Sequence, residues 1–206
     1  VGYFEPTDKS SVGPLAKTCQ RSAIDYTGRQ MPLTLLNDVL FKVVFGSQRH
    51  SEALRGLLNA ILELEGPKRI TEITILNPIR EKEHLADKGA ILDVKARDAQ
   101  GTLYNIEVQV QSQAGYLQRS LFYASTMVSQ QLEVGNDHRL LKKSIHISLT
   151  DFVLFPKQDD IKSTYILYDV GHSRALGDWL EIHYIELAKS VRDGSIRRSD
   201  PTAHGS

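Results

Sequence analysis

Hydrophobic residues recur with helical spacing in three segments of the chain. In 36–45 they occupy positions 36, 39, 40, 43 and 44, and in 51–64 they occupy 54, 57, 58, 61 and 62. In 116–134 they occupy 117, 121, 124, 128 and 132. Residues three and four apart share one face of a helix, so each segment predicts an amphipathic helix. Ser51 is a suitable N-cap for the second helix, and Gly135 a suitable stop for the third.

Shorter apolar runs between these helices predict β-strands. They are 70–75, 90–96, 104–110, 145–149, 164–170 and 180–187. The run 145–149 is mostly apolar, as in a strand that is buried on both faces. The resulting order is helix, helix, strand, hairpin, helix, strand, which predicts one α/β domain. We place this domain at 34–188.

The ends of the chain and one internal segment are polar. Residues 1–33 keep no helical or strand period, which predicts a flexible N-terminal extension. Met31 is a candidate for the natural start of the protein. The charged segment 80–89 predicts a solvated loop, and the polar residues 189–206 predict a disordered C-terminal tail.

Two carboxylates stand out in the predicted hairpin. Asp93 lies in the first strand and Glu107 in the second, and the polar segment 97–101 between them has turn chemistry. If the turn is centred near Gln100, Asp93 lies directly opposite Glu107, with Cβ atoms about 4.5–5.5 Å apart. Such a pair repels unless one acid keeps its proton or a cation lies between them. Mg²⁺ or Mn²⁺ suits carboxylate oxygens, and Gln109 projects on the same face as Glu107.

This arrangement resembles the PD-(D/E)XK nuclease superfamily, specifically its Rpn branch of recombination-promoting nucleases and transposases. The similarity rests on an ordered set of blocks that runs from about 35 to about 187. Besides the hairpin, these are 37–46, 57–62, 119–124, 131–135 and 147–152. The resemblance implies a restriction-endonuclease-like core, α-β-β-β-α-β, with a mixed central sheet flanked by helices. It also implies a Mg²⁺-dependent (or Mn²⁺-dependent) DNA endonuclease connected with recombination or a mobile element.

The same resemblance suggests roles for individual residues. Asp93 and Glu107 would hold the metal, and Asp38 of the first helix is a third candidate ligand. The alternative for Asp38 is an ion pair with Lys42, four residues on. Where the superfamily has a lysine, this chain has Gln109, which can orient a water but carries no charge.

The missing positive charge and the contacts with DNA need other residues. We expect Lys95, on the same face as Asp93, to supply the charge, with Lys88 as the alternative. Lys88, Arg119 and Tyr123 are candidates for DNA contacts, although Tyr123 could equally belong to the core. Gln109 and Gln111 could instead form a solvent-facing ladder. The spacing of the histidines does not suit a metal site, so we expect His138, His146, His172 and His183 to be structural.

Composition limits the choice of function without deciding it. The chain has 25 basic and 25 acidic residues, which counts against a protein that coats DNA non-specifically but not against a nuclease. The only cysteine, Cys19, excludes an internal disulfide and fits a cytoplasmic protein. Apolar runs fall short of the roughly 20 residues needed to span a bilayer. A second interpretation therefore stays open: an inactive nuclease-fold module that acts through protein contacts, for example as a homodimer.

Overall fold

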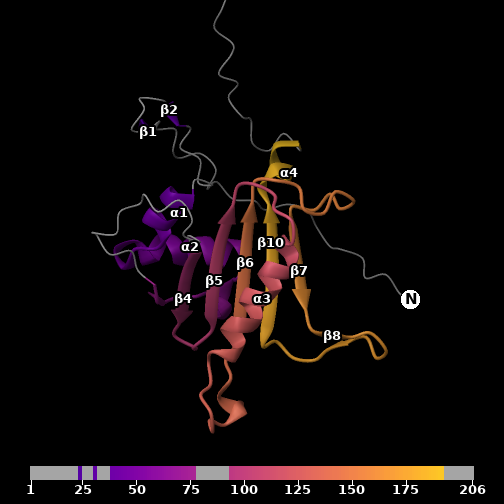
Figure 1. Cartoon of the computed structure of the whole chain (residues 1–206). Helices are drawn as coiled ribbons and strands as arrows, with labels where there is room; N and C mark the ends of the chain where they lie inside the picture. Colours follow the sequence, from indigo (N-terminus) through magenta and orange to yellow (C-terminus); the bar gives the residue numbers. More distant parts are fainter. Residues whose placement is uncertain (1–22, 25–29, 32–37, 78–92, 193–206) are drawn as a thin grey trace, which may run out of the picture. The chain divides into compact units, whose positions relative to one another are not determined.

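The computed structural model describes residues 23–24, 30–31, 38–77 and 93–192, and it divides the chain into two units, Val1–Leu33 and Thr34–Ser206 (Figure 1). In the first unit, β1 (Ala23–Ile24) pairs antiparallel with β2 (Gln30–Met31). The predicted loop at 80–89 and most of the predicted tail lie outside the described residues. The proposed domain limits therefore stay predictions.

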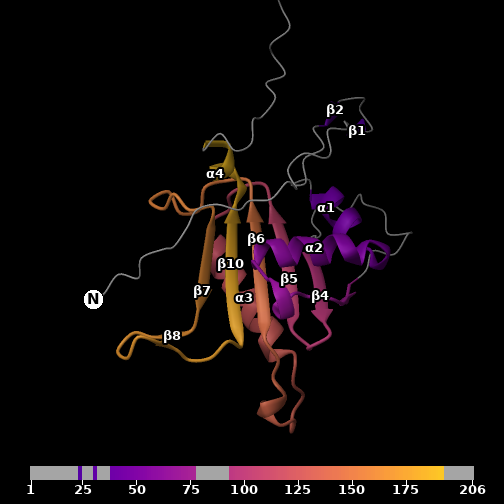
Figure 2. The same ribbon diagram turned by 180° about the vertical axis from the view of Figure 1, so that it is seen from behind.

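A six-stranded mixed sheet forms the centre of the second unit (Figures 1 and 2). Its strands, in spatial order, are β3 (Ile73–Ile75), β4 (Asp93–Asp98), β5 (Leu103–Gln109), β6 (Ser144–Thr150), β10 (Leu180–Glu186) and β7 (Lys162–Ile166). The pairs β5–β6 and β6–β10 are parallel, and the other neighbours are antiparallel. A separate small hairpin consists of β8 (Tyr168–Asp169) and β9 (Arg174–Ala175).

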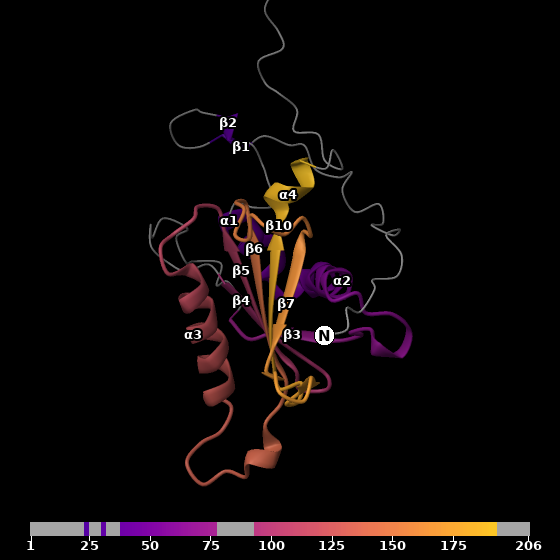
Figure 3. The same cartoon turned by 90° about the vertical axis from the view of Figure 1, so that its right-hand side faces the viewer.

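Helices cover both faces of this sheet. Figure 3 shows α3 (Tyr116–Ser129) on one face and α2 (Ser51–Ile61) on the other, where α1 (Asp38–Phe45) also packs. The remaining helix, α4 (Leu187–Arg192), continues from β10. Short 3₁₀ turns occur at Gln48–His50, Gly66–Lys68 and His138–Leu140. The predicted fold class, a mixed sheet between helices in the α-β-β-β-α-β order, is confirmed.

The bounds of several elements differ from the predicted ones. The second helix ends at Ile61 rather than 64, because the backbone turns to a positive φ of 54° at Glu63. The third helix ends at Ser129, short of the predicted 134. The predicted strand 164–170 is divided between β7 and β8. None of the described helices is long and apolar enough to cross a membrane.

The sheet face under α1 and α2 carries the apolar core. Phe41 and Phe45 stack with ring centroids 4.7 Å apart, and Leu54 and Leu58 of α2 are fully buried. They pack against side chains of the sheet that point to this face: Val94, Ala96, Ile106, Val108, Ile145, Ile147 and Leu149. Burying this much apolar surface is the main favourable term in folding. This layer holds the hairpin rigidly from behind.

The opposite face, under α3, is unusually polar. The helix buries Tyr116, Ser120 and Ala124, while Leu117 and Leu121 of its apolar stripe are 41% and 54% exposed. The apolar positions of α3 are therefore not the ones that face the sheet, because the sheet beneath the helix presents polar side chains. These are Asn105, Glu107, His146 and Ser148, all buried. A polar pocket under a helix is costly unless its groups are paired or used, which points to this face as the functional one.

Candidate active site

The hairpin places the two carboxylates directly across from each other. Asp93 pairs with Glu107 in the antiparallel register of β4 and β5. Asp98 fixes the turn, since its Oδ1 accepts from the backbone N–H groups of Gln100 at 3.0 Å and Thr102 at 2.8 Å. Gly101 completes the turn with a φ of 90°, a conformation that glycine adopts without strain. The predicted register, centred on Gln100, is confirmed.

Glu107 is a buried acid with one oxygen that has no partner. The residue is only 3% exposed, and its Oε1 accepts a hydrogen bond of 2.8 Å from Nη2 of Arg119. Its Oε2 is buried, makes no hydrogen bond and lies 3.9 Å from Nε2 of His146. Burial raises the pKa of Glu107 above its usual value, Arg119 opposes this rise, and Asp93 adds to it. The site therefore holds a carboxylate at a cost, as functional sites often do.

His146 supports Glu107 as a neutral imidazole. It is fully buried, and burial together with Arg119 lowers its pKa to about 4. Its Nδ1 accepts from the amide of Asn105 at 3.0 Å, which leaves the proton on Nε2, 3.2 Å from Oγ of Ser148. The sequence predicted a structural role for this histidine. Its hydrogen bonds with Asn105 and Ser148 fit a structural role. The spacing of the histidines did not predict that His146 would lie beside Glu107.

Arg119 provides a positive charge inside the site. Besides Glu107, its Nη2 donates to Oε1 of Gln109 at 2.8 Å, and its Nη1 donates to Gln113 at 2.7 Å. Its guanidinium lies 5.1 Å from the ring centre of Tyr116. The sequence assigned Arg119 to DNA and left the charge to Lys95 or Lys88. Tyr116, Arg119 and Tyr123 are three and four residues apart, so they share one face of the helix. This spacing was the signal in the sequence that could have indicated the contact between Arg119 and Glu107.

The other predicted cations occupy different positions. Nζ of Lys95 lies 3.8 Å from Oδ2 of Asp93, so Lys95 and Arg119 each pair with one of the two acids. Half of the Lys95 side chain is exposed, whereas the Asp93 side chain is 18% exposed. Lys88 lies outside the described residues, and its predicted role in binding DNA stays a prediction.

Gln109 and Tyr123 both face the site region. Nε2 of Gln109 donates to the carbonyl oxygen of Gln111 at 2.9 Å, so both ends of this amide are held. Gln109 is thus turned toward Arg119 and does not form the solvent-facing ladder that was the alternative. Tyr123 is half-buried, and its ring lies 5.9 Å from that of Phe122.

The donor set fits a hard divalent cation. Within the described part of the chain, no group of three or more His, Cys, Asp or Glu side chains could hold a metal, so the candidate ligands are Asp93 and Glu107. Mg²⁺ commonly binds through one or two carboxylates and keeps several waters. The Oε2 of Glu107, which accepts no hydrogen bond, is the oxygen left for such a bond. Asp38 begins α1, but its side chain is not among those described, so its predicted role stays untested.

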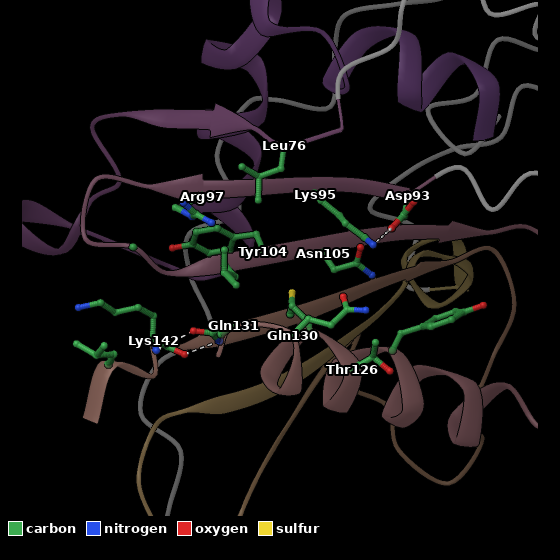
Figure 4. A pocket seen from close by; sticks show the side chains of 15 residues that line it. Leu76, Asp93, Lys95, Arg97, Tyr104, Asn105, Thr126, Gln130, Gln131 and Lys142 are labelled. Atoms are coloured by element: carbon green, nitrogen blue, oxygen red, sulfur yellow. Dashed lines mark hydrogen bonds and ion pairs between the residues drawn. The ribbon is translucent and has the colours of Figure 1, made fainter. Parts of the chain in front are cut away.

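A groove leads away from the acid pair along the α3 face (Figure 4). Its volume is about 610 Å³. It runs between β4–β5 and the C-terminal half of α3, from Asp93 toward the turn at Gly101. Asp93 therefore lies at one end of this groove, whereas Glu107, its cross-strand partner, is buried and does not line it.

Comparison with known proteins gives one match. The model of a family described as PD-(D/E)XK nuclease family transposase matches residues 35–201. No curated protein and no solved structure matches the chain.

Proposed function

The chain belongs to the PD-(D/E)XK nuclease family transposases, and from this premise we propose that it is a metal-dependent DNA endonuclease that hydrolyses phosphodiester bonds. The observation that carries the proposal is the pair Asp93 and Glu107, in direct cross-strand register, with one buried carboxylate oxygen free. Asp93 already pairs with Lys95 and Glu107 with Arg119, and the carboxylate oxygens that remain are the hard donors that Mg²⁺ or Mn²⁺ binds. The family supports a nuclease, and the acid pair supports dependence on a metal.

Asp93 and Glu107 are the residues that would hold Mg²⁺ or Mn²⁺. Such an ion lowers the pKa of a bound water and polarises a phosphoryl oxygen. Asp93 is the more accessible of the two acids and lies at the end of the groove, where a phosphate can approach. Arg119 of α3 donates a hydrogen bond to Oε1 of Glu107, which holds the carboxylate in one orientation.

Arg119 and Gln109 perform the tasks that a single lysine performs in the wider superfamily. The guanidinium of Arg119 contributes a permanent positive charge beside Glu107, where negative charge builds up on the phosphate during attack. Gln109 contributes only dipoles, because its amide is neutral. Its contacts with Arg119 and Gln111 fix the direction of those dipoles.

The finer parts of the proposal rest on the family and on chemistry. The description of the family as transposases supports a role in recombination or in a mobile element. A nuclease of this type implies DNA as partner, and an acid pair of hard oxygens implies Mg²⁺ or Mn²⁺ as cofactor. The cytoplasm is the compartment we propose.

The proposal is tested by plasmid nicking with Mg²⁺ or Mn²⁺ against EDTA. Asp93→Ala removes one ligand and should abolish metal-dependent cleavage without unfolding the protein, because it also relieves the repulsion with Glu107. Asp159→Ala removes an exposed acid outside the site and should leave cleavage unchanged. Thermal melting of both variants checks that they are folded.

Two outcomes would overturn the proposal. If Asp93→Ala cleaves as fast as the parent, the activity belongs to another site or to a contaminant. If the parent itself cleaves neither DNA nor RNA with any of these metals, the interpretation as a non-catalytic module takes its place.

A further inference from the structure

The groove beside the acid pair is lined by positive charge. Lys95 and Arg97 project into it from β4, and Lys142 lines its far end. Asp93 is the one acidic residue among the described residues that line it, and it is already paired with Lys95. Arg97 and Lys142 form no ion pair with any described residue. Two uncompensated cations thus follow the acid pair along the groove.

The floor of the groove holds a polar atom that has no partner. Asn105 is 4% exposed, and its Nδ2 donates to His146. Its Oδ1 is buried and accepts no hydrogen bond. A buried acceptor without a donor destabilises the folded protein, so such an atom in a binding groove indicates a ligand that brings a donor.

The α3 wall adds an aromatic ring and amides. Tyr123 and Met127 line the groove from this helix. Figure 4 shows Thr126 nearer the Asp93 end and Gln130 farther along the groove. A partly exposed aromatic ring in the same groove as cations is the combination that proteins use to bind single strands, because every base can stack and every phosphate is an anion.

We propose that this groove binds one unpaired strand of DNA and leads it to Asp93 and Glu107. The phosphates lie along Lys95, Arg97 and Lys142, an N–H group of a base donates a hydrogen bond to Oδ1 of Asn105, and a base stacks on Tyr123. This inference rests on the proposed function and deepens it by naming a single strand as the substrate.

The floor of the groove selects the single strand over the duplex. In a duplex, the Watson–Crick donors of the bases are already used, and the bases are stacked inside the helix. They are then unable to reach a buried acceptor between a sheet and a helix. A groove of about 610 Å³ is also of the size that holds a small ligand, which corresponds to a short stretch of one strand.

Fluorescence anisotropy tests the proposal on the full chain, in EDTA so that nothing is cleaved. The probe is a short labelled oligothymidylate, alone or annealed to oligoadenylate. We expect the single strand to bind at least about tenfold more tightly than the duplex. The double variant Arg97→Met and Lys142→Met keeps the aliphatic stems, one of which packs over Gly101, and removes both charges. It should weaken binding about tenfold and reduce the salt slope by about 0.7 for each cation.

The matched control is Lys68→Met with Lys157→Met, which removes the same charge from two exposed positions outside the groove. The proposal is overturned if both double variants lose binding equally, if neither does, or if the duplex binds as tightly as the single strand. Cleavage of the same oligothymidylate by the parent, with Mn²⁺ in place of EDTA, separates the two proposals. Cleavage with unaltered binding in the groove variant rejects the groove alone, whereas groove-dependent binding without any cleavage of single strand or plasmid rejects the nuclease alone.

Discussion

At the scale of single residues, the site is organised by one guanidinium shared between an acid and an amide. Arg119 binds both Glu107 and Gln109 through the same nitrogen. In the proposed nuclease, this contact would supply the positive charge of the lysine whose position Gln109 occupies. It also changes what a substitution at Gln109 is expected to do.

We predict that the positive charge needed for cleavage can be supplied from position 119 or from position 109. Arg119→Gln should lower the cleavage rate about 100-fold, the usual effect of losing one group that stabilises the transition state. The sequence pattern alone favours a gain from Gln109→Lys, but in the structure this lysine would lie against Arg119 and should reduce activity. In the Arg119→Gln background, the same Gln109→Lys should restore at least about tenfold. Single-turnover nicking rates of the four proteins measure this.

An increase in rate for Gln109→Lys alone would contradict the role given to Arg119. Gln109→Ala provides the control, since it removes the acceptor without adding charge. It should reduce the rate less than Arg119→Gln does.

The pKa of Glu107 predicts how metal binding depends on pH. It is raised above 4.5 by burial, so the acid takes up a proton, and loses metal affinity, as the pH falls through a value above 4.5. Arg119 holds this pKa down. In Arg119→Gln the loss of Mn²⁺ binding should therefore move to higher pH. Calorimetric titration with Mn²⁺ over a pH series measures the shift, and a shift to lower pH would contradict the assignment.

At the scale of elements, α3 adds the positive charge of Arg119 to the acid pair of the β4–β5 hairpin. Tyr116, at the start of α3, packs this helix against the rest of the domain. The buried ring makes edge contacts with Phe152 at 5.8 Å and Tyr184 at 6.4 Å, and it lies under Arg119. Its hydroxyl is buried near Ser148, but no hydrogen bond of good geometry joins them. The ring therefore contributes packing, and the oxygen contributes little to stability.

We expect Tyr116→Ala to destabilise the protein by about 3–5 kcal/mol, as for other large aromatic side chains in a core. It should also lower nicking, because Arg119 loses its support. Tyr116→Phe keeps the ring and should change the free energy of unfolding by less than about 1 kcal/mol. Denaturant unfolding of the two variants measures both values. Equal losses would show that the hydroxyl, and not the ring, holds the helix.

At the scale of the whole molecule, a net charge of zero says nothing about where the charges lie. Asp93 and Glu107 each pair with a cation, and the groove beside Asp93 holds two further cations, Arg97 and Lys142, that form no ion pair with any described residue. Attraction of a phosphate backbone is then local to the groove and falls with salt. Composition alone cannot reveal such a distribution.

Metal binding should be visible in the stability of the whole chain. A ligand that binds only the folded state adds about 2.7 kcal/mol at 100 times its Kd. The Tm of the parent should therefore rise with Mg²⁺ or Mn²⁺ and return with EDTA, while the Tm of Asp93→Ala should stay constant. The same shift in Asp93→Ala would place the metal elsewhere in the protein.

The sequence by itself determined the features that depend on neighbours along the chain. The turn around Asp98 and Gly101 and the alternation of side chains are local, so the register that brings Asp93 opposite Glu107 could be predicted. The helices and the order of elements followed from periodicity in the same way. The specific fold needed the resemblance to a family.

Only the tertiary structure decided what surrounds the acid pair. Arg119 reaches Glu107, and His146 lies behind it, because α3 and β6 are packed against β5. The buried face of α3 is set by the polar sheet below it, which overrides the apolar stripe of the helix itself. The groove with its unpaired Asn105 likewise exists only between elements. Such contacts join residues far apart in sequence, so their energies depend on burial and packing that no local pattern contains.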